Sequence, residues 1–303
     1  MTPLCTIELS IKEAKVTEAD GVRLLRHAEA VLPEGLYQDG MPDPGLGFFV
    51  RDLLDQAQIQ ATNCRVAISE AGVAVRDFRL PRMPRGELAS AVLFEGKRLV
   101  PIDPEGVFYA WHARPDRDGY AVYLVAARRE MVDGLIVALG SAGLTVDRID
   151  LKPLALARGA GVWDGLLLEW GAGEATLVLM ADGRPRFFRT FVLDAPDMDA
   201  GSQFEEIVLS VNALVRFMRS AQPPLALESS TPLVLAGRFA FLGGAEEQAR
   251  HRFEFSVRYP AAPQAVPAGF PWQAHLSALG LLAPSPAAAR LTPSQGGDTR
   301  VAA

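Results

Sequence analysis

Two glutamates, Glu8 and Glu169, each end a short apolar run and are followed by a tight turn. A carboxylate at the end of a strand can organise Mg²⁺ through bound water. A glycine in the following turn lets a phosphate approach the backbone N–H groups closely. The second turn contains Gly171 and Gly173, whereas the first has Ser10 and no glycine. The two turns could therefore form a site for a phosphate ligand, and the first turn is the poorer half of it.

Other reactive side chains show no spacing that predicts a catalytic residue or a set of metal ligands. Neither a G-x-S-x-G nucleophile elbow nor a G-x-x-x-x-G-K-[ST] phosphate loop occurs. The tryptophans are scattered, and we expect Trp111, Trp163, Trp170 and Trp272 to pack in the core. We expect no catalytic residue and no metal site among the histidines and cysteines, which are His27, His112, His251, His275, Cys5 and Cys64.

The chain of 303 residues carries 30 basic and 36 acidic side chains. This acidic balance argues against a dedicated DNA- or RNA-binding protein, whose affinity depends on neutralising phosphates. The N-terminus lacks the basic start and apolar stretch of a signal peptide, and no run of about 20 mostly apolar residues could span a membrane. We therefore expect a cytoplasmic protein of about two domains that neither binds nucleic acid nor inserts directly into a membrane.

The two glutamates belong to an internal repeat with an offset of 161 or 162 residues. In both copies Glu-Ala follows the first glutamate at the same distance, and an Asp-Gly hairpin signal comes next. Each copy predicts a three-stranded meander, with coincidence as the alternative because Ala and Glu are common. A duplicated α/β fold explains the repeat, and the actin-like fold is one such duplication. The repeated pairs are Glu13-Ala14 with Glu174-Ala175 and Asp20-Gly21 with Asp182-Gly183.

Periodicity and turn signals predict the remaining elements of an α/β fold. The clearest helix covers residues 202–219, which carry a continuous apolar stripe. Further helices are expected over residues 43–58, 84–99, 128–139 and 151–158. Strands are expected over residues 64–69, 73–80, 107–113, 120–126, 144–149, 166–170, 175–179, 186–193, 233–236 and 253–257.

Two segments between the repeats resemble the type IV pilus assembly protein PilM family, which is related to FtsA. Residues 80–101 contain Leu-Pro, a helix with a central Glu95, and a following proline. Residues 123–158 contain a strand, a helix, a GL-x-V-x-x-ID strand and a P-x-ALAR helix. Residues 166–179 resemble the second phosphate loop of the family, and residues 233–244 resemble its adenosine-side turn. The order and spacing of these motifs over about residues 5–282 carry the resemblance.

The resemblance implies a duplicated actin-like (ribonuclease H-like) α/β fold with an inserted FtsA/PilM-type subdomain. We expect the first actin-like half at residues 1–80 and 149–162, the inserted subdomain at residues 81–148, and the second half at residues 163–283. We expect a disordered tail at residues 284–303. The implied function is that of a scaffold or adaptor of a type IV pilus or related secretion platform. Such a protein reaches the inner membrane by holding the N-terminal tail of a PilN-like protein, and self-association is left open.

The chain departs from the family where a nucleotide would bind. The first phosphate loop of the family begins Asp-x-Gly-Ser and reaches a lysine seven residues after the aspartate. In this chain Glu8 replaces the aspartate of the first loop, and Glu169 replaces the aspartate of the second. A glutamate carries its carboxylate one methylene further out, where it would crowd a phosphate or displace the metal. Arg238 lies in the adenosine-side turn, where the family has a run of glycines, and could fill the base or ribose pocket. The positions of this vestigial nucleotide site are Glu8, Ser10, Lys15, Glu169, Gly171, Gly173, Ala236 and Gly237, and the β-branched Ile11 stands where the family has a small residue.

We therefore expect a retained fold without a cofactor, that is, a pseudo-ATPase with no ATP binding or only weak binding. The alternative is an actin-superfamily ATPase or small-molecule kinase that binds ATP with Mg²⁺ through divergent loops. A third hypothesis is a filament-forming protein like FtsA, and the resemblance implies a C-terminal amphipathic membrane helix for such a protein. Residues 290–303 contain proline and glycine and cannot form this helix, which argues against the third hypothesis. The partner groove is expected between the first half and the inserted subdomain, at Val73–Leu80 and Glu87–Trp111.

Overall fold

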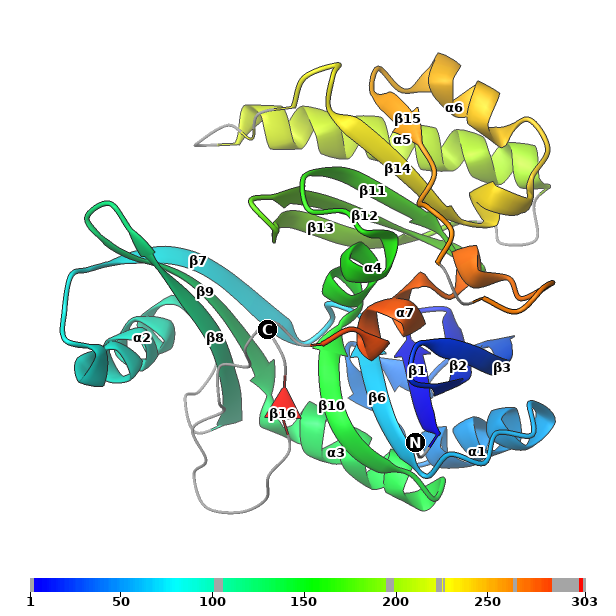
Figure 1. Ribbon diagram of the computed structural model, residues 1–303, viewed down its shortest axis with the longest axis horizontal. Helices are drawn as coiled ribbons and strands as arrows, with labels where there is room; N and C mark the ends of the chain where they lie inside the picture. The colour runs from blue at the N-terminus through cyan, green and yellow to red at the C-terminus, as the bar shows by residue number, and fades with distance from the viewer. Residues whose placement is uncertain are drawn as a thin grey trace.

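Two mixed β-sheets with the same strand order form the frame of the molecule (Figure 1). The structure is a computed structural model that describes residues 3–100, 106–194, 199–221, 225, 227–263, 266–284 and 300–301. Among these residues no helix is long and apolar enough to cross a membrane.

The first sheet has the strand order β16-β10-β6-β1-β2-β3. Strands β1 (Leu4–Leu9), β2 (Glu13–Asp20) and β3 (Arg23–Val31) form the expected antiparallel meander. Strands β6 (Asn63–Ile68) and β10 (Thr145–Leu151) continue the sheet in parallel with β1. Helices α1 (Leu46–Gln56) and α3 (Arg129–Ser141) pack against it and against each other, beside the short ribbon of β4 (Tyr37–Gln38) and β5 (Met41–Pro42).

The second sheet has the order β13-β12-β11-β14-β15, which corresponds to β3-β2-β1-β6-β10 of the first, whereas β16 has no counterpart in this sheet. It consists of β11 (Gly165–Trp170), β12 (Glu174–Ala181), β13 (Arg184–Val192), β14 (Pro232–Gly237) and β15 (Ser256–Arg258). Glu8 lies opposite Lys15 in the first meander, and Glu169 lies opposite Thr176 in the second, so the two registers are the same. The duplicated α/β fold is therefore confirmed.

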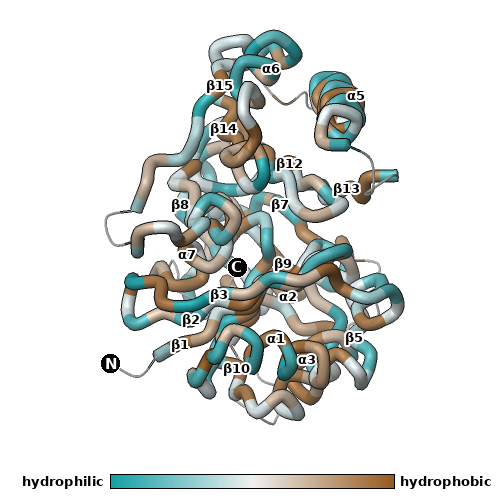
Figure 2. The backbone as a smooth tube through the Cα atoms, turned by 90° about the vertical axis from the view of Figure 1, so that its right-hand side faces the viewer, coloured by the Kyte–Doolittle hydropathy of each residue, from teal (hydrophilic) through white to brown (hydrophobic). Residues whose placement is uncertain are grey.

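Helix α5 (Ala200–Ser220) covers the second sheet with the apolar stripe expected from the sequence. It begins two residues earlier than expected because the Asp199 carboxylate accepts hydrogen bonds from the N–H groups of Gly201 and Ser202. Helix α6 (Ala245–Arg252) lies on the outside of this half. Figure 2 shows that the residues of strand β14 are hydrophobic, whereas those of the outer helix α6 are hydrophilic.

A small antiparallel sheet with the order β7-β9-β8 projects to the left in Figure 1. It contains β7 (Val73–Pro81), β8 (Val107–Asp116) and β9 (Gly119–Arg128), and α2 (Arg85–Leu99) packs on one face. Strand β7 pairs with β9 along its whole length, although we expected residues 73–80 in the first half. The chain leaves the first sheet after β6 through a turn at Gly72, whose φ of 75° favours glycine.

The expected disordered tail, residues 284–303, lies mostly outside the described residues. Its described residues Arg300–Val301 form β16, which pairs in parallel with β10. Strand β16 therefore covers part of the outer edge of the first sheet.

Helices α4 (Lys152–Ala160) and α7 (Leu276–Leu282) cross with their backbones in contact. A Cβ atom added to Gly159 would lie 1.8 Å from the carbonyl oxygen of Leu276, and one added to Gly280 would lie 1.7 Å from that of Ala155. Glycine is therefore required at both positions by the close approach of the helices. The crossing holds α7 against strands β1 and β6.

We predict that Gly280→Ala destabilises the protein by about 2–3 kcal/mol or more, because the two helices must separate to admit one methyl group. Gly140→Ala is the matched control, since an added Cβ there meets no atom within 4 Å. The control should stabilise the protein by about 0.5–1 kcal/mol, as is usual for Gly→Ala within a helix. Urea unfolding measures both, and equal effects would contradict the crossing geometry.

Candidate functional site

The two repeated glutamates meet where the ends of β1 and β11 face each other. Lys152, the first residue of α4, lies between them. Its Nζ atom is 3.1 Å from Glu8 Oε1, 2.9 Å from Glu169 Oε2 and 2.9 Å from Glu174 Oε1. Glu8 and Glu169 therefore face each other between the halves, with a lysine bridging them.

A second lysine, Lys15 on β2, also contacts Glu8 and Glu169. Its Nζ atom is 2.7 Å from Glu13 Oε1, 3.4 Å from Glu8 Oε1 and 3.5 Å from Glu169 Oε1. All members of this carboxylate–lysine cluster have at most 4% of their surface exposed. The cluster comprises Glu8, Glu13, Lys15, Lys152, Glu169 and Glu174.

Each of the two turns is closed by a carboxylate from the opposite half. Glu174 Oε2 accepts a hydrogen bond of 2.9 Å from the N–H of Lys12, and Glu13 Oε2 accepts one of 2.9 Å from the N–H of Ala172. The Ser10 hydroxyl also donates to Glu174. A Cβ atom on Gly171 would lie 2.5 Å from Glu13 Oε1. Gly171 therefore makes room for a carboxylate of the chain itself.

Burial and charge act in opposite directions on the pKa values of the cluster. Burial would lower the pKa of both lysines, but the surrounding carboxylates outweigh it and raise each pKa well above its usual value. Burial opposes ionisation of Glu8 as well, yet Lys15 and Lys152 lower its pKa to about 2. The pKa of Glu169 is raised because burial outweighs the two lysines there. Glu169 is thus the carboxyl group of this pair that takes up a proton more readily.

The cluster does not fit a divalent cation. One ligand oxygen from each of Glu8, Glu13 and Glu169 lies within 4.8 Å of the others, which is a suitable spacing for a metal site. However, the Lys15 ammonium contacts all three carboxylates. A protein cation already stands where a metal ion would bind, so the residues present do not fit ATP with Mg²⁺.

Aromatic side chains pack beside the expected adenosine-side turn, and a cavity of about 310 Å³ remains at that turn, lined by Phe239, Ala240, Leu242 and Gly244 among others. Trp170, Phe204 and Phe239 are buried, with ring centroids 5.2–6.4 Å apart. The Arg238 guanidinium lies 5.7 Å from the centroid of the Trp170 ring, and its Nη1 atom is 3.4 Å from Gln203 Oε1. The end of β14, at Ala236 and Gly237, also lies close to the backbone of β11. A Cβ atom added to Gly237 would lie 2.3 Å from the carbonyl oxygen of Trp170.

His275 is a buried neighbour of the cluster that was not expected from the sequence. Its Nδ1 atom lies 3.0 Å from Thr17 Oγ1, and only 1% of its surface is exposed. Burial is the main cause, and the nearby Lys15 a further one, of a pKa lowered to about 3. Glu13, Lys152 and Glu174 were also missed as site residues, although the repeated Glu-Ala pairs contained two of them.

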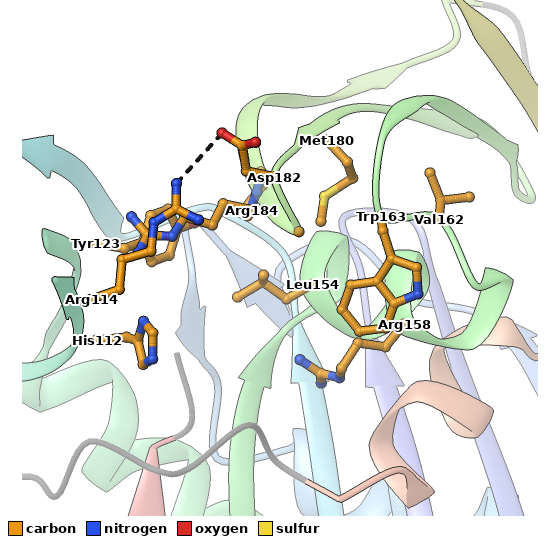
Figure 3. A pocket seen from close by; sticks show the side chains of 12 residues that line it. His112, Arg114, Tyr123, Leu154, Arg158, Val162, Trp163, Met180, Asp182 and Arg184 are labelled. Carbon is orange, nitrogen blue, oxygen red and sulfur yellow. Dashed lines mark ion pairs between the residues drawn. The ribbon is translucent and has the colours of Figure 1, made fainter. Parts of the chain in front are cut away.

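A cavity of about 350 Å³ opens between the small sheet, α4 and the β12–β13 turn (Figure 3). His112 and Tyr123 line it from the small sheet, and Leu154 lines it from α4. Trp163, which we expected in a core, is 58% exposed beside this cavity. Arg184 also lines it, together with Arg114, Arg158, Val162, Met180, Asp182, Gly183 and Pro185.

Comparisons with known proteins identify the fold. No family model matches the sequence, and no curated protein sequence is significantly similar. A chain of the solved "PilM-PilN type IV pilus biogenesis complex" superposes with a TM-score of 0.72 at 24% identity, covering 92% of this chain and 97% of that one. The chain has the actin-like fold.

Two further solved structures share the actin-like fold over most of their length. The cytoplasmic domain of EpsL, an inner membrane component of the type II secretion system of Vibrio cholerae, has a TM-score of 0.53 and 12% identity, with 93% of this chain and 96% of that one covered. The ethanolamine utilization protein EutJ from Carboxydothermus hydrogenoformans has a TM-score of 0.53 and 13% identity, with 93% and 89% covered. The actin-like architecture therefore accounts for nearly the whole chain.

We predict that Lys152→Met destabilises the protein by about 3–5 kcal/mol, because it leaves buried carboxylates without their shared cation. Lys97→Met on the exposed surface of α2 is the control and should change the free energy of unfolding by about 0.5 kcal/mol or less. Chemical denaturation distinguishes the two. A small effect at Lys152 would mean that the buried ion pairs are not formed.

The lowered pKa of His275 predicts a loss of stability in weak acid. In the unfolded chain a histidine takes up a proton near pH 6.5, whereas folded His275 stays neutral until about pH 3. The free energy of unfolding should therefore fall as the pH drops below about 6.5, by about 2 kcal/mol at pH 5. The groups facing this histidine are Lys15, Glu8, His27 and Glu29.

The His275→Asn variant isolates this contribution, since it keeps a polar atom near Thr17 and cannot titrate. Urea unfolding at pH 7.5 and pH 5 should show a smaller pH dependence for the variant than for the wild type. An equal dependence would show that His275 becomes protonated in the folded protein.

Proposed function

We propose that this chain is a PilM-like scaffold or adaptor of a type IV pilus or related secretion platform. In this proposal it is cytoplasmic and reaches the inner membrane by holding the N-terminal tail of a PilN-like protein. The observation that carries the proposal is the similarity of almost the entire chain to a component of a PilM–PilN complex. The cavity beside the small sheet supports it, because it offers a place for a short extended peptide.

The groove that we propose differs from the one expected from the sequence. Strand β7 and the turn before it are tied to the second half, since Asp77 of β7 pairs with Arg186, and the Thr190 N–H and hydroxyl donate to Glu70 of the turn. Its side chains do not line the cavity. We therefore place the groove between the ends of β8 and β9 and helix α4.

The side chains of the cavity indicate the chemistry of the tail. Trp163 and Leu154 offer an apolar wall, which suits an apolar side chain of an extended peptide. Arg184 donates to the carbonyl oxygen of Ala121, and a carboxylate oxygen of Asp182 lies 3.5 Å from Arg114. An acidic group next to the apolar side chain would match these arginines, so binding should weaken as salt is added.

We predict that a peptide with the N-terminal sequence of the PilN-like protein encoded by the same organism binds to the full chain. Trp163→Ala should weaken binding about tenfold or more, because an exposed tryptophan in a groove is a typical anchor of an interface. Arg184→Glu should weaken it by a similar factor and reduce the salt dependence. Fluorescence anisotropy measures the dissociation constants.

Phe94→Ala provides the matched control for this experiment. Phe94 is also an exposed aromatic residue of the small subdomain, 74% exposed on α2, but it does not line the cavity. The control should bind like the wild type. Absence of binding by the intact wild-type chain would refute the adaptor proposal, whereas binding that is insensitive to Trp163 and Arg184 would refute only the position of the groove.

A further inference from the structure

We propose that the carboxylate–lysine cluster takes the place of a bound nucleotide and its cation, so that the chain's own side chains clamp the two halves together. This inference is independent of the proposed partner. It rests on three features of the cluster: the groups that bind the turns, the groups that neutralise the carboxylates, and the space that remains.

The first feature is that carboxylates occupy the anion-binding groups of the turns. Backbone N–H groups in tight turns bind phosphate oxygens. Here the N–H of Lys12 donates to Glu174, and the N–H of Ala172 donates to Glu13. The two contacts run in opposite directions between the halves, so each half supplies the anion that the other half binds.

The second feature is that lysines occupy the position of a cation. Lys152 bridges carboxylates of both halves, and Lys15 does the same from the opposite side. A metal ion would have to displace both ammonium groups, because each contacts three carboxylates at 2.7–3.5 Å. The positive charge that the carboxylates require is therefore supplied within the chain.

The third feature is the lack of space for a phosphate group next to the cluster. A cavity of only about 10 Å³ adjoins the cluster, lined by Glu8, Lys15 and His275 among others. A single water molecule needs at least this volume, so a phosphate group cannot enter without displacing side chains. Glu13 of the cluster also packs against Gly171, so side chains of the chain itself occupy the space between the two meanders.

The proposal predicts that a substitution in one half exposes a backbone amide in the other half. Glu174→Met keeps the length of the side chain but cannot accept a hydrogen bond, so the amide of Lys12 should exchange its hydrogen about tenfold faster. Glu13→Met should have the same effect on the amide of Ala172. Hydrogen exchange of the full chain, followed by mass spectrometry, measures both.

Glu18→Met is the matched control, because Glu18 is an equally buried carboxylate that acts within one half. It accepts hydrogen bonds from the N–H groups of Gln60 and Ala61, at 2.9 and 3.0 Å. The control should accelerate exchange at these two amides and leave the amide of Ala172 unchanged. Equal acceleration of Ala172 by Glu18→Met and Glu13→Met would overturn the clamp between the halves.

A milder variant and a ligand test cover the case in which Glu174→Met does not fold. Glu174→Gln retains a weaker acceptor, and it should accelerate exchange at Lys12 about threefold. For the wild type, neither ATP with Mg²⁺ at millimolar concentration nor EDTA should shift the melting temperature by more than about 1 °C. Stabilisation by ATP with Mg²⁺, or destabilisation by EDTA, would overturn the proposal.

Discussion

Four carboxylates and two ammonium groups are buried together between the halves of this protein, and the positions of the surrounding elements follow from their pairing. Buried charges of this kind are strongly destabilising when one partner is missing. The common register of β1 and β11 brings Glu8 and Glu169 together, and α4 must begin where Lys152 can reach both. The glycine contacts between α4 and α7 hold that helix in place.

Helix α4 connects this cluster with the proposed partner groove. Its first residue, Lys152, enters the cluster, and Leu154 and Arg158 on the same helix line the cavity beside the small sheet. Arg158 also pairs with the buried Asp150, which fixes the helix to the end of β10. One wall of the groove is therefore anchored by buried charges, and a peptide would meet a surface that is already ordered, which lowers the entropic cost of binding.

The sequence predicted the fold better than the site. The repeat predicted two meanders in one register because hairpin signals and strand patterns act locally, and both meanders are confirmed. The cluster depends on contacts between residues far apart in the chain, such as Glu174 with Lys12, and a sequence pattern does not specify which carboxylate reaches which turn. For the same reason the sequence did not specify the pairing of β7 with β9, which joins residues about 40–50 positions apart in the chain.

The reciprocal closure of the two turns restricts how this sequence can change. Glu13 accepts a hydrogen bond from the turn of the second half and Glu174 accepts one from the turn of the first, so neither turn can be opened by removing a carboxylate of its own half. Substitution of either glutamate alone leaves a buried lysine or an N–H group of the other half without its partner. Opening the two turns would therefore require coordinated changes in both halves, and sequence changes at these positions are coupled across the molecule.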